Sequence, residues 1–264
     1  MKIIVVLLYL LALVNIASYT FYRVKHHGKA HLIVKNPAEK GSRMTYCIPG
    51  IKSNTADAFK FTESTTVHED SLIPGGVTYV NYDDFGFDAK TIASEIIRDI
   101  KKNHYQPYIV CISVGDQVAR YVEDKIKNLS IITINPITND ECLKFKVQIR
   151  LRFKQAIANF FLALSGWLGY LKLVRTGYKT RRSLSLNNDM QNCIIGSHLE
   201  VGKTATKGLI FSHHDEYLDN AIVYDIFSYV NGIETTMVDT EHANTYIGSC
   251  LYREKATKMF KNIY

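Results

Sequence analysis

One serine, one histidine near the end of the chain and several carboxylates each follow directly or shortly after an apolar run of this sequence. Ser113 follows the apolar run 106–112 and leads directly into a pattern typical of a helix. A serine hydroxyl is too weak an acid to attack a carbonyl unaided, so it needs a base, and the base needs an orienting carboxylate. Asp215 and His242 follow later, each shortly after another apolar run. These residue types favour nucleophilic catalysis if the fold brings them together.

Ser113 also has a purely structural interpretation. Serine is a favoured N-cap, and a helix is expected over residues 116–128. Position alone does not separate a cap from a nucleophile, so the partners of Ser113 must decide.

The elements that would position these residues alternate along the chain. Apolar runs predict strands over 29–36, 43–50, 75–86, 106–113, 129–137, 208–214 and 233–239. Helical patterns are expected over 53–61, 88–103, 116–128, 217–232 and from about 244. This alternation predicts an α/β fold with a mostly parallel sheet flanked by helices. Functional groups collect at the carboxyl ends of such strands, where the serine, the acidic residues and the histidine all fall.

The stretch "CISVG" (111–115) resembles the nucleophile elbow G-x-S-x-G of the α/β-hydrolase family, with Cys111 in place of the first glycine. The order of Ser113, Asp215 and His242 is also that family's order of nucleophile, acid and histidine. The resemblance covers about residues 28–264 and implies an α/β-hydrolase fold with these three as the catalytic triad. It further implies that "IPGIKSN" (48–54) is the oxyanion loop, with the backbone N–H groups of Ile51 and Val114 as donors.

Two alternatives concern the carboxylate and the neighbouring histidines. Asp219 is an alternative acid if Asp215 only caps a helix. His213 and His214 beside Asp215 resemble metal ligands, but adjacent strand residues point to opposite faces. We therefore expect no metal and no organic cofactor.

A block at about 141–186 interrupts the alternation, and we interpret it as a helical lid inserted after the sixth strand. Its centre is strongly hydrophobic, and lysines and arginines flank it on both sides. Segment 156–174 is long enough for a second membrane span, but no return span follows it. A hydrophobic, basic lid would lie against anionic headgroups.

The first residues favour a transmembrane anchor over 1–24. Residues 3–22 carry no charge and suffice to cross the hydrocarbon layer. The flanking charges favour a cytoplasmic side for the catalytic domain, residues 25–264. A cleaved signal peptide is the alternative, and the domain would then be exported.

The composition agrees with one domain carrying an anchor. The chain has 264 residues, of which 47% are hydrophobic. Its net charge of +7 favours an acidic neighbour. Because no nucleic-acid motif is present and the basic residues flank the predicted lid, we interpret that neighbour as a lipid surface. Five cysteines without metal-ligand spacing argue against a disulfide framework.

Together these features predict a membrane-associated serine hydrolase that cleaves an ester, such as a lipid or another apolar acyl ester. The alternative is a catalytically silent protein of the same fold that uses its hydrophobic, basic lid face for binding.

Overall fold

The architecture is seen in a computed structural model. The structure describes residues 30–50, 75–82, 87–157 and 189–242 apart from 196 and 198, with short pieces within 3–17 and 258–263.

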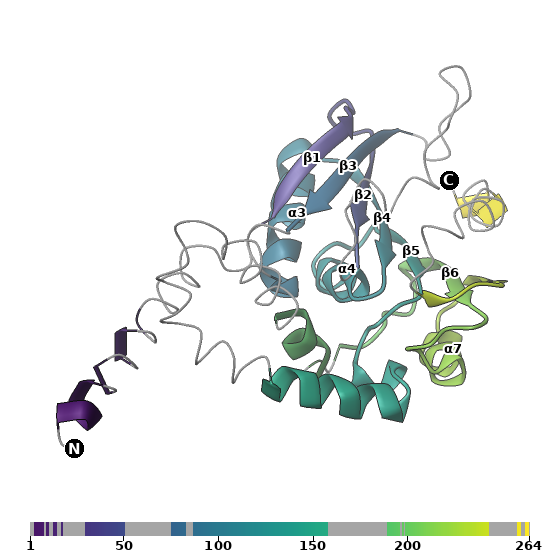
Figure 1. Cartoon of the computed structure of the whole chain (residues 1–264). Helices are drawn as coiled ribbons and strands as arrows, with labels where there is room; N and C mark the ends of the chain where they lie inside the picture. Colours follow the sequence, from purple (N-terminus) through teal and green to yellow (C-terminus); the bar gives the residue numbers. More distant parts are fainter. Residues whose placement is uncertain are drawn as a thin grey trace.

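In the part of the chain that the structure describes, seven strands form one sheet in the order β1-β3-β2-β4-β5-β6-β7 (Figure 1). β1 pairs with β3 antiparallel, and all other neighbours are parallel. The predicted α/β class with a mostly parallel sheet is confirmed. The strands are β1 (His31–Asn36), β2 (Arg43–Ile48), β3 (Gly76–Asn81), β4 (Gln106–Ile112), β5 (Ser130–Ile134), β6 (Thr206–Ser212) and β7 (Glu234–Val238).

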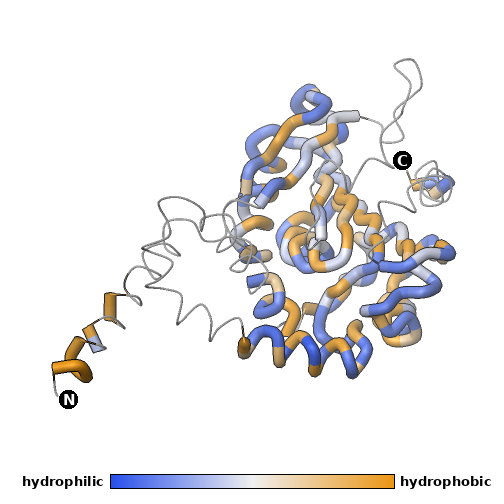
Figure 2. The backbone as a smooth tube through the Cα atoms, viewed as in Figure 1, coloured by the Kyte–Doolittle hydropathy of each residue, from blue (hydrophilic) through white to orange (hydrophobic). Residues whose placement is uncertain are grey.

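The central strands are buried on both faces. In β4, Ile109 and Cys111 belong to one core cluster, whereas Val110 and Ile112 belong to the other. Because successive strand residues point to opposite faces, such a strand must be apolar throughout. Figure 2 accordingly shows hydrophobic residues concentrated along the middle of the sheet.

Three labelled helices contribute to the larger of the two clusters: α3 (Ala89–Asn103), α4 (Gly115–Glu123) and α7 (Asn220–Ser228). In α3, Asp88 caps the first turn by accepting from the N–H groups of Lys90 and Thr91. Ile92 and Ile96 are fully buried, as the helical period predicts.

Two helices are shorter than predicted. α4 ends at Glu123 rather than near 128, because the chain must turn back to bury Leu129 and begin β5 at Ser130. α7 begins at Asn220 rather than 217, because the side chain of Asp219 caps it there. The expected helix over 53–61 lies outside the described residues, as does most of the C-terminal one, of which 258–259 and 262–263 are described as helical.

The block at 141–186 is described only in part. It includes helical residues 145–157, preceded by η2 (Asp140–Cys142), and residues 189–195 beyond it are helical again. The lid interpretation of the remainder lies outside the described residues. Five described strands precede this block, whereas the prediction places the lid after a sixth.

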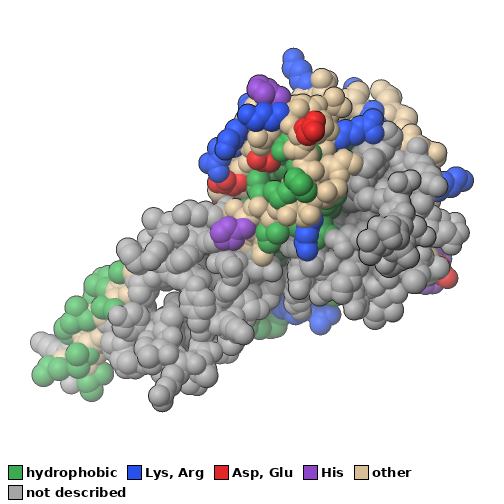
Figure 3. All heavy atoms as spheres, turned by 90° about the horizontal axis from the view of Figure 1, so that it is seen from above, with side chains coloured by type: hydrophobic (Ala, Val, Ile, Leu, Met, Phe, Trp, Pro, Cys, Tyr) green, Lys and Arg blue, Asp and Glu red, His purple; other side chains and the backbone are tan. Residues whose placement is uncertain are grey.

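The anchor predicted over residues 1–24 is also described only in pieces. Those pieces carry exposed hydrophobic side chains, which Figure 3 shows on the N-terminal segment. Within the described parts of the chain, no helix is both long and apolar enough to cross a membrane.

Candidate active site

Ser113 occupies a sharp turn between β4 and α4. Its φ of 56° lies in the left-handed region, which non-glycine residues seldom adopt. Its N–H donates to the carbonyl of Ile134 at 2.9 Å, and its own carbonyl accepts from the N–H of Asp116 at 3.1 Å. Val114 is the N-cap residue of α4, and no side chain caps that end. The Ser113 hydroxyl therefore does not serve as a helix cap.

Glycines make room for this turn. A Cβ on Gly115 would lie 2.7 Å from the carbonyl oxygen of Ile48, and one on Gly50 would lie 2.8 Å from Cβ of Ser113. Cys111, in place of the first glycine of the elbow pattern, is fully buried within β4. Burial raises the pKa of its thiol well above the usual range, so this sulfur remains protonated.

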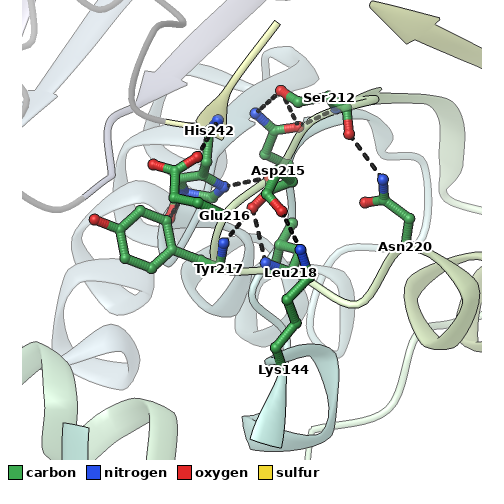
Figure 4. Close-up of polar contacts among 10 residues, drawn as sticks. Lys144, Ser212, Asp215, Glu216, Tyr217, Leu218, Asn220 and His242 are labelled. Atoms are coloured by element: carbon green, nitrogen blue, oxygen red, sulfur yellow. Dashed lines mark hydrogen bonds and ion pairs between the residues drawn. The ribbon is translucent and has the colours of Figure 1, made fainter. Parts of the chain in front are cut away.

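His242 joins Ser113 to Asp215. Its Nε2 lies 3.0 Å from Oγ of Ser113. Its Nδ1 lies 2.7 Å from Oδ2 of Asp215, and Figure 4 shows these two residues side by side. A carboxylate can only accept, so Nδ1 carries the hydrogen and Nε2 is free to accept from the serine hydroxyl. The structure thus brings together three residues that are 129 and 27 positions apart.

The Asp215 carboxylate is held by its own loop. Its Oδ1 accepts from the N–H groups of Tyr217 and Leu218 at 2.8 and 2.7 Å, which leaves Oδ2 for His242. The side chain is fully buried, whereas Asp219 is only half-buried and accepts from the first N–H groups of α7. The structure places Asp215 against the histidine and Asp219 at a helix end.

Three contacts around this group were not anticipated from the sequence. The His242 N–H donates to Glu216 Oε2 at 2.9 Å, and the Tyr217 ring lies edge-on to the imidazole at 5.3 Å. Lys144 donates from Nζ to the backbone carbonyl of Asp215 at 2.5 Å (Figure 4). The first two residues directly follow Asp215, and this adjacency is the only sequence signal for them. Lys144 has none, because it comes from the block before β6.

One of the two predicted oxyanion donors is described. The N–H of Val114 makes no hydrogen bond to another described residue, as befits a donor just before a helix. Ile51 lies outside the described residues, but the two residues before it are held close to the turn. Tyr82 donates its hydroxyl hydrogen to the Pro49 carbonyl, and Gly50 contacts Ser113 closely.

A buried charge network lies beneath the turn. The Asp116 carboxylate is fully buried and accepts from Arg120 at 2.8 Å, from Thr133 at 2.9 Å and from Thr138 at 2.7 Å. Arg120 also donates to Thr206 of β6 at 2.8 Å. The network joins α4 to β5, to β6 and to the loop that follows β5.

A second polar cluster links the ends of β5 and β6. Asn135 has a φ of 47°, and its Oδ1 accepts from the Ser212 N–H at 2.7 Å. Asn220 donates to the Ser212 carbonyl at 2.8 Å (Figure 4). These bonds fix the strand end from which the Asp215 loop departs.

No metal centre is found among the described residues, where no three His, Cys, Asp or Glu side chains converge. His213 and His214 are exposed. His214 pairs with Asp239 at 3.0 Å, and His213 Nδ1 lies 2.9 Å from the sulfur of Met237.

Comparison with known proteins places this arrangement among solved folds. No family model and no curated protein matches the sequence. A search of solved structures finds an alpha/beta hydrolase enzyme from a Medee basin deep-sea metagenome library, at TM-score 0.63 and 14% identity, covering 88% of this chain and 94% of that one. The chain has the α/β-hydrolase fold.

Two further solved structures agree with this fold. The esterase from Exiguobacterium antarcticum matches at TM-score 0.58 and 12% identity, over 88% of this chain and 96% of its own. The enol-lactonase from Burkholderia xenovorans matches at TM-score 0.58 and 8% identity, with the same coverage. Identities this low establish the α/β-hydrolase fold alone. Within that fold, Ser113, Asp215 and His242 each follow a parallel strand: β4, β6 and β7, respectively.

Proposed function

We propose that this chain is a serine hydrolase that cleaves carboxylic esters through Ser113, His242 and Asp215. The observation that carries the proposal is the continuous hydrogen-bonded row from Asp215 through His242 to a serine held at φ 56°. A helix-capping serine would need none of these partners, whereas a nucleophile needs all of them.

In this reaction Ser113 Oγ attacks the ester carbonyl carbon as its proton passes to His242 Nε2. The developing oxyanion accepts from the Val114 N–H, with Ile51 as the proposed second donor. Collapse of the intermediate breaks the bond to the alcohol, which leaves with the proton from Nε2. Water then attacks the acyl-enzyme by the same route, releasing the acid and restoring Ser113.

The proposed substrate is an apolar acyl ester, with lipids included. Tyr217, 39% exposed and beside His242, offers an aromatic surface at the reacting atoms. The structural neighbours named above include an esterase and an enol-lactonase. We further propose that residues 1–24 anchor the chain in a membrane, since residues 3–22 carry no charge. The flanking charges favour a cytoplasmic catalytic domain.

A fluorophosphonate probe tests the central claim, because it phosphonylates only an activated serine. The wild-type chain should react, and Ser113→Ala should not. Ser228→Ala is the matched control, since that exposed hydroxyl only donates to the Asp225 carbonyl, and this variant should react like the wild type. A folded wild-type chain that does not react would favour the catalytically silent binding protein.

A further inference from the structure

The helix formed by residues 145–157 buries one face and exposes an apolar one. Val147 and Leu151 are partly buried and pack against the main core. The residues of another row, spaced four apart, are apolar and between 40 and 74% exposed: Phe145, Ile149, Phe153 and Ile157. Residues four apart lie on one face of a helix, so this row forms a continuous stripe.

The same helix is unusually basic. Between positions 144 and 157 the sequence has no Asp or Glu and five basic residues: Lys144, Lys146, Arg150, Arg152 and Lys154. Lys146, Arg150 and Lys154 are themselves four apart and exposed, so they form a second row beside the apolar stripe. Figure 2 shows hydrophobic and hydrophilic bands alternating along this helix, which is teal in Figure 1.

Within the part of the chain that the structure describes, few of these charges are paired. Arg152 lies 3.5 Å from a carboxylate oxygen of Asp140, and it is the one residue of the five with a described ion pair. An exposed apolar stripe bordered by exposed cations is the pattern of helices that lie in the plane of a membrane. Anionic headgroups attract the cations, and the stripe enters the acyl boundary.

We propose that the helix of residues 145–157 docks this protein onto an anionic lipid surface. A bilayer fits better than an acidic protein, because the chain also carries the charge-free segment 3–22. A lipid bilayer can bury that segment, whereas an acidic peptide has no apolar environment for it.

Docking through this helix brings the candidate active site close to the lipid. Lys144 immediately precedes the helix, its N–H donates to the Tyr217 carbonyl at 2.9 Å, and its Nζ donates to that of Asp215. If the proposed hydrolase activity holds, on which this step rests, its substrates are esters that partition into the anionic membrane. The docking itself does not depend on the activity.

The test is photo-crosslinking of the full chain from the bilayer. Vesicles of phosphatidylcholine with phosphatidylglycerol, doped with a photoactivatable phospholipid, are irradiated with the protein, and labelled peptides are mapped by mass spectrometry. The apolar stripe should be labelled. Label on 145–157 should fall at least about tenfold in pure phosphatidylcholine, since each basic residue near an anionic surface contributes appreciably to binding.

Charge reversal provides the matched pair of variants. The first triple variant carries Lys146→Glu, Arg150→Glu and Lys154→Glu. It should lose label to a similar extent. The second makes the same charge change on exposed residues of α3 and beyond α4, and should keep its label: Lys101→Glu, Lys102→Glu and Lys125→Glu. Circular dichroism establishes that each variant is folded, and Phe153→Ser, a neutral change in the stripe, should also reduce the label.

The proposal is overturned if 145–157 is unlabelled, if both lipid mixtures give equal label, or if both triple variants lose it. A helix that takes up no label from anionic vesicles would point instead to an acidic protein partner. Ser113→Ala should be labelled like the wild type. A chain that docks but ignores the fluorophosphonate probe would refute the proposed activity alone.

Discussion

Ser113 and Asn135 share an unusual backbone at adjacent strand ends. Both have positive φ, at 56° and 47°, although neither is glycine. Such residues cost of order 1–3 kcal/mol each and persist only where their surroundings enforce them. Here the enforcing contacts are specific: the Ser113 N–H donates to Ile134, and Asn135 is bonded to Ser212. Among the described residues, the third non-glycine residue with positive φ is His104, which ends α3, so the strain at Ser113 and Asn135 is the part that lies near the proposed reaction.

If Ser113, His242 and Asp215 act as a unit, their losses will not add. Ser113→Ala and His242→Ala should each lower kcat/KM for a p-nitrophenyl ester by about 10⁴-fold or more, and the double variant should be scarcely worse. The reason is that neither group accelerates the reaction without the other. Steady-state kinetics measures this, and multiplicative losses in the double variant would argue against the triad.

The two candidate carboxylates can be separated by matched substitutions. Asp215→Asn should reduce kcat by roughly 10⁴-fold, since the amide no longer stabilises the imidazolium or its tautomer. Asp219→Asn should leave both kcat and the melting temperature nearly unchanged, because asparagine caps a helix as well as aspartate does. The opposite result would mean that Asp219 is the acid.

At the scale of elements, helix α3 and the strand before Ser113 could be predicted because their signals are local. The isoleucine period and Asp88 define α3, and "CISVG" marks the turn. The roles of Lys144 and Asp116 could not be predicted, because they depend on tertiary contacts. From sequence, a carboxylate in the first turn of a helix is expected to be exposed to solvent. Asp116 is instead fully buried, and its hydrogen-bond partners come from β5 and from the loop after it.

That buried network should contribute strongly to stability. Asp116→Ala removes one of the two carboxylates paired with the buried Arg120 and leaves only that of Glu123. It should lower the free energy of unfolding by about 3–5 kcal/mol. Glu95→Ala removes the exposed pair with Arg98 and should cost under about 1 kcal/mol. Urea unfolding measures both. Equal effects would mean that the buried pair is no more important than a surface one.

Strand β2 and helix α3 are joined by a titratable bond. The Tyr46 hydroxyl donates to Asp99 at 2.7 Å. Burial, and to a lesser extent this hydrogen bond, raises the pKa of Tyr46. The folded state therefore keeps this proton above about pH 10, where the unfolded state loses it, so stability falls as pH rises. Between about pH 10 and 11, unfolding free energy should fall more steeply in the wild type than in Tyr46→Phe, by up to about 1.4 kcal/mol per pH unit. Parallel curves in urea titrations would contradict this.

At the scale of the whole molecule, positive charge and apolar surface coincide. The net charge is +7, and five cations cluster beside the exposed stripe of helix 145–157. Two separate membrane contacts are therefore proposed, an anchor that inserts and a helix that rests on the surface.

Deleting residues 1–24 separates the two contacts. The truncated chain should leave the membrane fraction at high salt, with weak binding to anionic vesicles returning as the salt concentration falls. Sedimentation with vesicles, followed by immunoblotting, measures this. Recovery of the natural protein soluble and lacking its N-terminus would instead identify a cleaved signal peptide, with the domain exported.

The strand order has a consequence for the life of the nascent chain. Ser113 follows β4 near the centre of the sheet, whereas His242 follows the edge strand β7 and is 129 residues later. At typical rates of synthesis a ribosome needs roughly 6 to 26 seconds to cover that distance. During that interval the proposed nucleophile has no base. If the proposed activity is correct, an unfinished or stalled chain is therefore inert toward esters, and activity begins only once β7 has joined the sheet and His242 has been placed beside Ser113.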